Sequence, residues 1–493
     1  MSEIRVTYSG LIAFAIRLSS VLTGIVFTLI VTRELSQEEF GTWSLIGGLL
    51  VYVIIIEPII SFWTTREIAR GNNVSRTSVI TNGLSSIVGI LVYLVISFIV
   101  GVNSQIEYKI LFFASILIPV IFVNNTLNAI CTGWKPHVVS YGFLMFEITK
   151  IPVALLLVYF MALGIEGAIL STFVAHIIGI TTLLFFVKSK IKEHFNLSFV
   201  RNCIRKFWLP TYRDLPPLLF TSDVVIFSII TASVIGVAYY SAARTIAYLV
   251  MHIDSFSSAL YPKFLAGGKQ EYLQENLNRL FYFAFPIMAI SIIFAKPGLF
   301  ALNPTYEVAA PIIIFLTIRG FLSTINKTFY SVLQGVEKVD IKENATFIDY
   351  IKSKLFWIPS IRLIQYSSYL GAISIGFFLF NTSSELELVI IWSLIGLLVE
   401  IPVLLYLVKM VKNHFTLKLD YKAIIKYLAS TILIFSLISI LVGSYLDYDV
   451  SIFEFLPDLL LFILCSIGCY LGITYLIDHR TRGLFNAIIK EIR

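Results

Sequence analysis

Long apolar runs separated by short polar segments dominate the hydrophobic pattern of this chain. About fourteen runs come close to 20 residues or exceed it, the length with which an α-helix crosses about 30 Å of hydrocarbon. The pattern predicts an all-α polytopic membrane bundle of about 14 transmembrane helices. The eleventh run is unusually polar in its first half, so this span is either tilted, broken at Pro359 or partly interfacial. The predicted spans are residues 8–32, 41–63, 78–101, 110–133, 139–162, 165–187, 211–235, 237–261, 279–300, 308–334, 345–380, 386–408, 423–445 and 456–477.

The composition agrees with a membrane protein and excludes several other classes. The chain is 58% hydrophobic and 14% charged, with a mean hydropathy of +0.88, whereas soluble domains are about a quarter charged. The formal charge of +7 is attributed to topology rather than to a nucleic-acid partner. Cys465 and Cys469 lie on a presumed span and match neither a disulfide framework nor a zinc site. His176 and His252 stand alone on their spans and are interpreted as satisfied core residues, so no metal and no cofactor are expected.

The distribution of lysine and arginine predicts the orientation of the chain. If the N-terminus is inside, the inner segments carry 26 of these residues and the outer loops carry three. By the positive-inside rule, both termini are cytoplasmic and the protein is a multi-pass protein of the cell (plasma) membrane. The first run lacks a basic leader and a cleavage site, so it is expected to be a retained helix. Of the sequons, those at Asn124 and Asn326 then lie near the cytoplasmic face, and Asn381 lies in an outer loop.

Three stretches of the first half recur in order in the second half. NNTLNAICTG at 124–133 is matched by NKTFYSVLQG at 326–335, and two further matches pair Glu57 with Asp254 and residues 192–206 with 412–426, within the basic segments 188–206 and 409–426. Each copy holds six spans, so the copies share one orientation and a pseudo-two-fold axis along the membrane normal. Such repeats are typical of secondary transporters, whose site lies at the repeat interface.

The repeat predicts two pseudo-symmetric six-helix lobes around a central cavity, with two extra C-terminal helices. The expected domains are an N-terminal lobe with its basic linker, a C-terminal lobe, and transmembrane helices 13–14 with the cytoplasmic tail. Each basic segment either lies on the anionic cytoplasmic leaflet or serves only to set the topology. The domain boundaries are 1–206, 207–422 and 423–493.

Charged residues remain within the predicted spans, where they are costly unless they face the protein interior or water. Eight are basic and six are acidic, so the excess is cationic. Arg17, Lys150 and Arg319 lie near the midplane, and Arg244 is somewhat shallower. The basic ones are Arg17, Lys150, Arg244, Arg319, Lys327, Lys352, Lys354 and Arg362, and the acidic ones are Glu57, Glu147, Asp223, Asp254, Asp349 and Glu400.

Helical spacing predicts which of these polar residues share a face. Arg319 and Asn326 fall on one stripe of the tenth span, and Asn124 belongs to the matching row of the fourth. These amides either line a substrate path or hydrogen-bond neighbouring helices. Two carboxylates also stand three residues before a lysine, in Glu147/Lys150 and Asp349/Lys352. These pairs, together with Glu57 and Asp254, either neutralise buried charge or act as coupling switches that substrate or a proton opens.

The first predicted hairpin resembles a known transporter family. TRELSQEEFGTWSLI at 32–46 and YPKF at 261–264 are similar to the Wzx-like polysaccharide biosynthesis flippases of the multidrug/oligosaccharidyl-lipid/polysaccharide exporter superfamily. The resemblance implies a V-shaped pair of lobes that moves a polyprenyl-linked oligosaccharide from the cytoplasmic to the outer leaflet. It also implies that the arginines of the first and eighth spans, Arg17 and Arg244, face the cavity.

The predicted function is therefore an alternating-access transporter, not an enzyme, that flips a polyprenyl-phosphate- or pyrophosphate-linked oligosaccharide for surface polysaccharide or glycoprotein synthesis. The expected substrate-binding residues are Arg17, Arg244, Arg319, Asn326 and Asn124. The expected partners are the lipid-linked oligosaccharide, membrane lipids and other glycan-assembly membrane proteins. The alternative is a cation- or proton-coupled antiporter of drugs or organic cations, which favours an acidic cavity. A glycan polymerase or ligase requires a large outer loop, and none exceeds about fifteen residues.

Overall fold

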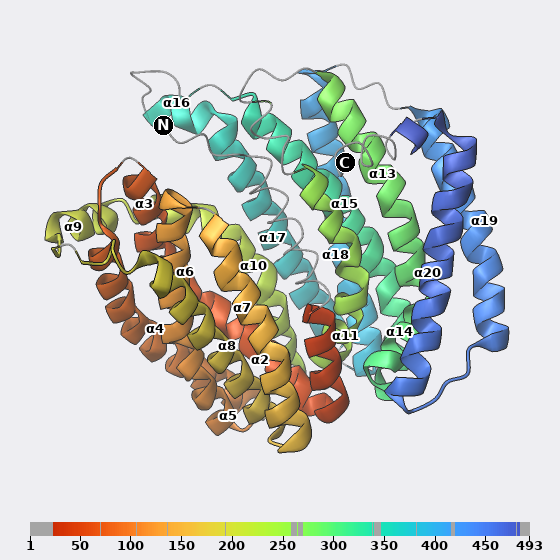
Figure 1. The fold of residues 1–493 in the computed structure, drawn as a ribbon, viewed down its shortest axis with the longest axis horizontal. Coiled ribbons are helices and arrows are strands. Elements are labelled where there is room, and N and C mark those ends of the chain that lie inside the picture. Colours follow the sequence, from red (N-terminus) through yellow and green to blue (C-terminus); the bar gives the residue numbers. More distant parts are fainter. Residues whose placement is uncertain are drawn as a thin grey trace. The chain divides into compact units, whose positions relative to one another are not determined.

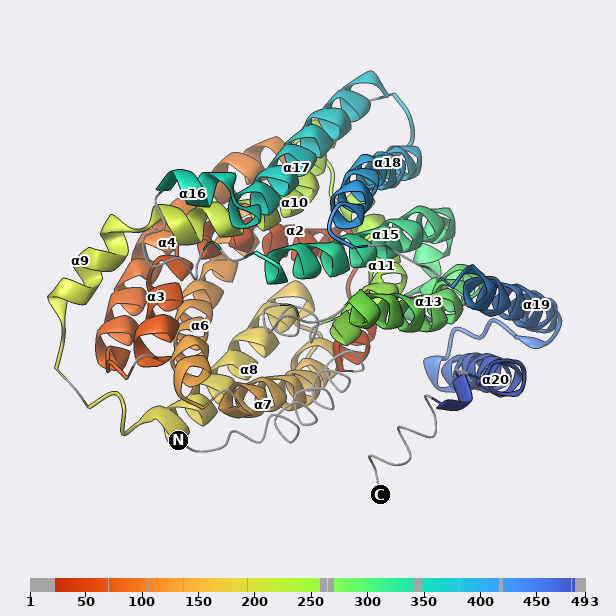
Figure 2. The same cartoon turned by 90° about the horizontal axis from the view of Figure 1, so that it is seen from above.

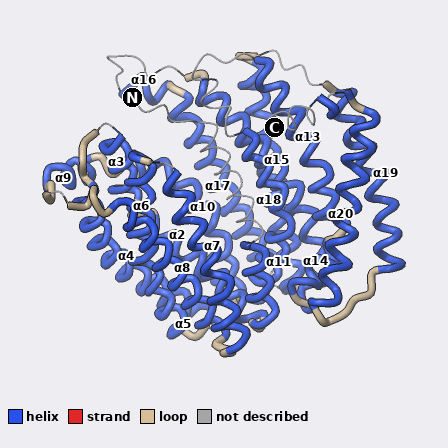
Figure 3. Tube along the Cα trace, viewed as in Figure 1, coloured by secondary structure: helices blue, strands red, loops and turns tan. Residues whose placement is uncertain are grey.

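The computed structural model of the 493-residue chain consists of helices joined by loops, and the described residues contain no strand (Figure 3). The described part of the chain is therefore all-helical, and the length and apolar composition of its helices are those of a multi-pass membrane protein. The structure describes residues 23–69, 71–104, 106–135, 137–192, 194–257, 264, 270–337, 339, 347–380, 382–415, 420–479 and 481–483.

Contacts divide the chain into two compact units (Figure 1). Unit 1 comprises Met1–Ala238 and Phe377–Thr382. Its helix α10 packs on α2, α3 and α4, whereas the repeat assigns the same segment to the second lobe. The lobe boundaries at 206/207 and 422/423 stay predictions. After a helical segment at 23–34, the elements of unit 1 are α2 (Gln37–Ile54), α3 (Pro58–Ala69), α4 (Ser75–Ser104), α5 (Tyr108–Phe113), η1 (Ala114–Ile116), α6 (Leu117–Trp134), α7 (His137–Ala154), η2 (Leu155–Phe160), α8 (Gly164–Val187), α9 (Leu197–Arg205) and α10 (Trp208–Thr231).

Unit 2 comprises Tyr239–Gly376 and Ser383–Arg493. The two last helices, α19 and α20, lie side by side (Figures 1 and 2) and pack on α13. At that contact the hydroxyl of Tyr470 donates to the backbone oxygen of Tyr282 at 2.8 Å. The helices of this part of the chain are α11 (Ile235–Ala247), η3 (Tyr248–Ser257), α13 (Gln270–Ile293), α14 (Ala295–Leu302), η4 (Pro304–Ala309), α15 (Ala310–Gly335), α16 (Phe347–Lys352), α17 (Lys354–Leu379), α18 (Glu385–Lys412), α19 (Tyr421–Tyr445) and α20 (Ile452–Ile477).

The helices agree with the predicted spans from the second to the fourteenth, with local interruptions. Within the described ranges, ten helices are individually long and apolar enough to cross a membrane, and a bent pair makes eleven. The first span falls largely on residues 1–22, which lie outside the described residues. The second, eighth, ninth and eleventh spans are each divided in two. The lengths of the apolar runs therefore predicted the positions of the spans, but they did not predict where the helices break.

The second span breaks at Glu57. Helix α2 begins at a capping box in which Ser36 Oγ accepts from the Glu39 amide at 3.2 Å, while Glu39 Oε2 accepts from the Ser36 amide at 2.9 Å. It ends at Ile54, and α3 starts at Pro58 with a bend of 62°. Proline is tolerated at the first position of a helix because it needs no amide partner there. Glu57 lies at the break and is 3% exposed. The polar backbone of the break is therefore in the protein interior.

The corresponding segment of the second copy is also irregular. Helix α11 ends at Ala247, and the chain continues as a 3₁₀ helix, η3, that contains Asp254. Asp254 is the residue that the repeat pairs with Glu57. Both copies therefore interrupt the α-helix around the same acidic position.

The eleventh span is broken, but not at Pro359. Helix α16 ends at Lys352 and α17 begins at Lys354, so the interruption is at Ser353. Pro359 lies inside α17. Of the three alternatives for this span, a break at Pro359 is contradicted, because α17 continues through Pro359 to Leu379. Pro359 is the sixth residue of α17, so it removes the hydrogen bond that an amide there would donate to the Leu355 carbonyl, and the helix continues despite this loss.

The repeated asparagine motif contributes to helix packing in unit 1. Helix α6, which carries NNTLNAICTG, packs on α3, α4 and α8. A Cβ on Gly133 would lie 2.7 Å from the backbone oxygen of Thr65. The hydroxyl of Thr65 donates to the backbone oxygen of Ala129 at 3.1 Å. Small residues at such contacts let membrane helices approach closely, which explains the glycine of the first motif.

Candidate functional site

An ion pair within unit 1 joins Glu147 and Lys150 on α7. The Lys150 ammonium is 3.3 Å from Glu147 Oε2, and the two side chains are 12% and 9% exposed. Thr23 Oγ1 donates to the same carboxylate oxygen at 2.8 Å. The ammonium also lies 4.7 Å from the Phe27 ring centroid and 5.1 Å from that of Phe146. The predicted shared helical face is confirmed, and the pair is tied to the helical segment that follows Arg17.

A second polar cluster surrounds the α2/α3 break. Asn82 Nδ2 on α4 lies 3.0 Å from Glu57 Oε1, 3.3 Å from the Glu57 backbone oxygen and 2.8 Å from Thr126 Oγ1 on α6. Asn82 and Thr126 are fully buried. One amide thus joins three helices and stabilises both the carboxylate and the broken backbone. A buried amide that lost these partners would cost about 1–3 kcal/mol.

In unit 2, Arg319 on α15 lies in an aromatic cage. It is 2% exposed, and its Nη1 donates to the hydroxyls of Tyr240 and Tyr369, each at 3.3 Å. The guanidinium carbon is 4.6 Å from the Tyr369 ring centroid. Trp392 stacks on Tyr240 at 3.7 Å and donates its indole N–H to Tyr369 at 2.7 Å. The cage satisfies hydrogen bonds and also offers negative ring faces to the cation.

Close packing of α18 against Arg319 requires a glycine. A Cβ on Gly396 would lie 2.7 Å from the guanidinium carbon of Arg319 and would also overlap its Nη1. Any larger residue therefore displaces the guanidinium from the cage. The glycine allows α15 and α18 to pack with a charged side chain between them.

A carboxylate on the same pair of helices accompanies this cation. Glu400 on α18 is 3% exposed, and its Oε2 accepts from Asn326 Nδ2 at 2.8 Å. Arg319 attracts Glu400 electrostatically, and Gln365 lies beside the carboxylate. Arg319, Asn326 and Glu400 therefore form a buried polar group in which each charge has partners. A charge this deep in a membrane protein requires such compensation.

Arg244 has a different environment. It lies on α11, is half-buried, and its guanidinium carbon is 5.8 Å from the Tyr240 ring centroid. No carboxylate of the described residues forms an ion pair with it. Asp254, a carboxylate on the neighbouring 3₁₀ segment, pairs instead with Lys327 at 3.2 Å. Within the described part of unit 2, Arg244 is therefore a cation without an acidic partner.

Comparison with solved structures identifies the architecture. Structural superposition on the lipid II flippase MurJ in an inward closed conformation gives a TM-score of 0.70 at 15% identity, covering 96% of this chain and 100% of that one. An inward-facing multidrug resistance MATE family transporter of the MOP superfamily gives 0.62 at 13% identity, covering 82% and 98%. The chain has the MOP superfamily fold. The MATE transporter VcmN of Vibrio cholerae, in its bent form, gives 0.51 at 13% identity, covering 87% and 98%.

These similarities are structural. No protein-family model matches the chain, and no curated protein sequence matches it significantly. The likeness at 13–15% identity establishes the MOP fold, and that fold agrees with the doubled helical plan that the sequence predicted.

The remaining predicted substrate-binding residues are Arg17 and the two motif asparagines. Arg17 lies outside the described residues. Asn326 bonds Glu400, whereas its repeat counterpart Asn124 has its side-chain oxygen 3.8 Å from where a Cβ on Gly179 of α8 would lie. Both motif asparagines thus lie against the sixth helix of their own copy. Their role in binding substrate stays a prediction.

The second charge pair is arranged differently from the first. Asp349 and Lys352 lie on the short helix α16, and Lys352 is exposed. Asp349 contacts other groups, but the described residues include no ion pair between it and Lys352. The switch hypothesis for this pair stays a prediction, and of the two repeat-related acid–lysine pairs the described residues show the ion pair of Glu147 and Lys150.

Several residues of these clusters were not predicted as site residues. Glu400 was counted among the intramembrane charges without a partner, and Asn82, Tyr240, Tyr369 and Trp392 were not identified. Spacing along one helix predicts a shared face, but it does not show which helix packs on that face. A single polar residue in an apolar span, such as Asn82, is the signal that was available.

One histidine interpretation was wrong. His176 Nδ1 is buried without a hydrogen-bond partner in the described residues. Its ring instead packs on Phe146 with centroids 4.6 Å apart. The histidine is held by ring packing beside the Glu147/Lys150 pair rather than by a satisfied hydrogen bond.

Removing one charge from the Glu147/Lys150 pair should impair folding and transport more than exchanging the two. Lys150→Ala leaves a buried carboxylate, and breaking a buried pair costs about 3–5 kcal/mol. Glu147→Lys with Lys150→Glu restores neutrality, although Thr23 no longer finds its acceptor. Membrane abundance and transport of both singles and the swap measure this difference.

The exposed pair Lys109/Glu107 is the control, because its atoms are 3.6 Å apart with side chains 78% and 60% exposed. Its exchange should be nearly silent, since surface pairs contribute about 0–1 kcal/mol. Normal transport by both Glu147→Ala and Lys150→Ala at normal abundance would show that the buried pair has no switching role.

Proposed function

We propose that this protein is a flippase that moves a polyprenyl-phosphate- or pyrophosphate-linked oligosaccharide from the cytoplasmic to the outer leaflet of the plasma membrane. Both termini are cytoplasmic in this proposal, and lobes related by the repeat alternate access. The product serves surface polysaccharide or glycoprotein synthesis. Other glycan-assembly membrane proteins supply the substrate and take up the product.

The extent of the structural likeness is the observation that carries the proposal. The superposition on the lipid II flippase covers 96% of this chain, so about 4% of the chain lies outside it. Helices α19 and α20 have 25 and 26 residues. Together they are longer than the part of the chain that the superposition leaves out, so the superposition includes at least part of them. The two MATE transporters cover 82% and 87%. The fold of the lipid II flippase therefore covers a larger share of this chain than the folds of the two MATE transporters do.

The charges support an anionic substrate. Arg244 is half-buried and has no carboxylate partner among the described residues, and Arg17 is a further intramembrane cation of the sequence. We assign the phosphate of the carrier to these two arginines. Arg319 binds it only if the stack of Tyr240 and Trp392 opens, because the guanidinium is 2% exposed in this structure.

Deletion of the gene tests the function. We expect lipid-linked oligosaccharide to accumulate with its sugar facing the cytoplasm, while surface glycan is lost. Probing intact and permeabilised cells with a membrane-impermeant glycosidase measures the orientation. Expression of the wild-type chain should reverse both effects.

A drug or organic-cation antiporter is the second candidate, favoured by the likeness to MATE transporters. It predicts that the deletion leaves the lipid-linked pool unchanged in amount and orientation and lowers efflux of a fluorescent organic cation. That pair of results would replace the flippase assignment.

A further inference from the structure

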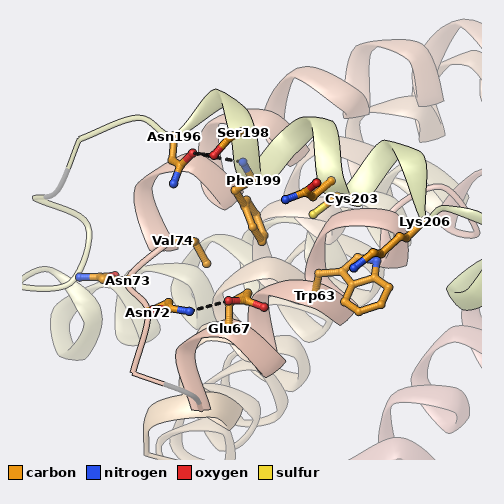
Figure 4. Close-up of a pocket in the computed structure, with 11 residues that line it drawn as sticks. Trp63, Glu67, Asn72, Asn73, Val74, Asn196, Ser198, Phe199, Cys203 and Lys206 are labelled. Carbon is orange, nitrogen blue, oxygen red and sulfur yellow. Dashed lines mark hydrogen bonds between the residues drawn. The ribbon is translucent and has the colours of Figure 1, made fainter. Parts of the chain in front are cut away.

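A polar pocket lies in unit 1, away from the buried charge clusters. It has a volume of about 470 Å³, within the range of roughly 300–1,000 Å³ that is usual for small-molecule sites. Helix α3, the loop that precedes α4, and the segment that forms α9 contribute its walls (Figure 4). These loops join the second span to the third and the sixth to the seventh. Both are inner segments in the predicted topology, so the pocket opens on the cytoplasmic side.

The short amphipathic helix α9 holds one wall in place. Phe199 and Cys203 are 7% and 1% exposed and pack with Ile60 and Val74, so they fix α9 on the start of α3 and α4. The backbone amide of Asn196 donates to Thr77 Oγ1 at 2.9 Å. Burial raises the pKa of the Cys203 thiol to about 12. The thiol is therefore neutral and belongs to the apolar floor of the pocket.

Amide side chains form much of the rim and retain hydrogen-bonding capacity. Asn196 Oδ1 accepts from the Phe199 amide at 3.1 Å and from Ser198 Oγ at 2.6 Å, and Asn73 Oδ1 accepts from Ser75 Oγ at 2.9 Å. In both cases the amide oxygen is used for a local turn, and these hydrogen bonds leave the NH₂ group to donate. Asn202 is exposed and makes no side-chain hydrogen bond with described residues.

The charges of the lining residues cancel. Glu67 is the acidic residue and Lys206 the basic residue of the lining. Asn72 Nδ2 donates to Glu67 Oε2 at 2.7 Å, and the Lys206 ammonium lies 5.2 Å from the Trp63 ring centroid. The indole N–H of Trp63 is buried without an acceptor in the described part of the chain. A bare phosphate gains no net charge attraction here, whereas a neutral polyol finds donors and acceptors.

We infer that this pocket binds a saccharide unit of the lipid-linked substrate before it enters the membrane. A pyranose ring has an apolar face and a rim of hydroxyls, which matches an apolar floor bounded by amides that can both donate and accept. The inference rests on the proposed function, since it assigns the pocket to the sugar of the same substrate. It makes α9 a substrate-selecting element and leaves the phosphate to the intramembrane arginines.

The test uses the purified full-length protein in lipid nanodiscs and an array of immobilised mono- to tetrasaccharides, followed by titration with the free form of the saccharide that binds. We expect the wild-type protein to retain one class of saccharide. Asn202→Ala should weaken binding about tenfold, the effect expected when one or two hydrogen bonds are lost. Asn202→Phe, which fills the opening, should abolish it.

The control is Arg201→Ala, which changes an exposed neighbour on the same helix that does not line the pocket. It should bind as the wild type does. Three results would overturn the inference: no saccharide retained by the wild type, unchanged binding by both Asn202 variants, or equal competition by polyprenyl phosphate without a sugar. Asn202 makes no side-chain bond within the described fold, so neither variant should lose stability.

The outcome is separable from that of the proposed function. If the deletion strain accumulates inward-facing lipid-linked oligosaccharide but no saccharide binds, the flippase assignment stands and the pocket assignment is wrong. If saccharides bind with the expected dependence on Asn202 but the lipid-linked pool is unaffected by deletion, the pocket binds sugar and the flippase assignment is wrong.

Discussion

Replacing Arg319 with methionine is expected to lower the free energy of unfolding by about 3–5 kcal/mol, the usual cost of removing one member of a buried charge pair. The variant leaves Glu400 buried at 3% exposure without Arg319, which has the larger effect of the two arginines that act on it, while Arg362, which has the smaller effect, remains. It also removes two hydrogen bonds to Tyr240 and Tyr369. The measurement is thermal unfolding of the purified protein in detergent, together with its abundance in the membrane.

The double variant Arg319→Met with Glu400→Gln is the informative control. The amide keeps an oxygen for Asn326 to donate to and carries no charge, so the double variant should be more stable than Arg319→Met alone. Non-additivity of this kind is the signature of interacting residues. If the two effects simply add, the Arg319 and Glu400 side chains do not compensate one another.

Arg244→Lys is expected to reduce flipping by roughly ten- to a hundredfold while leaving the protein folded. A planar guanidinium binds two phosphate oxygens at once, whereas an ammonium acts as a point charge. Each charge-assisted contact contributes about 1.5–3 kcal/mol. Because no described carboxylate pairs with Arg244, a purely structural role predicts little change. Rescue of surface glycan in the deletion strain measures the effect, with Arg17→Lys tested alongside.

Arg279→Lys is the matched control. Arg279 is exposed and pairs with Glu275 on the same helix, so the lysine preserves the charge and the pairing without touching the interior. It should rescue fully. Full rescue by Arg244→Lys and Arg17→Lys at wild-type abundance would contradict the phosphate assignment.

Apolar run lengths were enough to predict the positions of the spans, because burial in hydrocarbon requires a nearly continuous apolar helix. They did not predict the breaks. The break at Glu57 depends on Asn82, 25 residues away on α4, and the break at Ser353 is not at the nearby Pro359. Helix interruptions are stabilised by partners from other helices, and these are not encoded in the local pattern.

The same reasoning explains which part of the candidate site was predictable. The Glu147/Lys150 pair is a local i, i+3 contact, so its spacing predicted its geometry. The cage of Arg319 is not local, since Tyr240, Tyr369 and Trp392 come from α11, α17 and α18. Intramembrane position predicted that Arg319 must be compensated. It did not predict that aromatic hydroxyls would provide much of this compensation.

The different surroundings of Glu57 and Asp254 bear on how a duplicated chain diverges. In one copy the acid is buried and bound by the neutral amide of Asn82; in the other it is partly exposed and paired with the cation Lys327. The same substitution at the two positions should therefore have unequal effects. The contact between Glu57 and Asn82 depends on shape and burial, whereas the contact between Asp254 and Lys327 depends on charge. A substitution that is tolerated at one of these positions is therefore no guide to tolerance at the other.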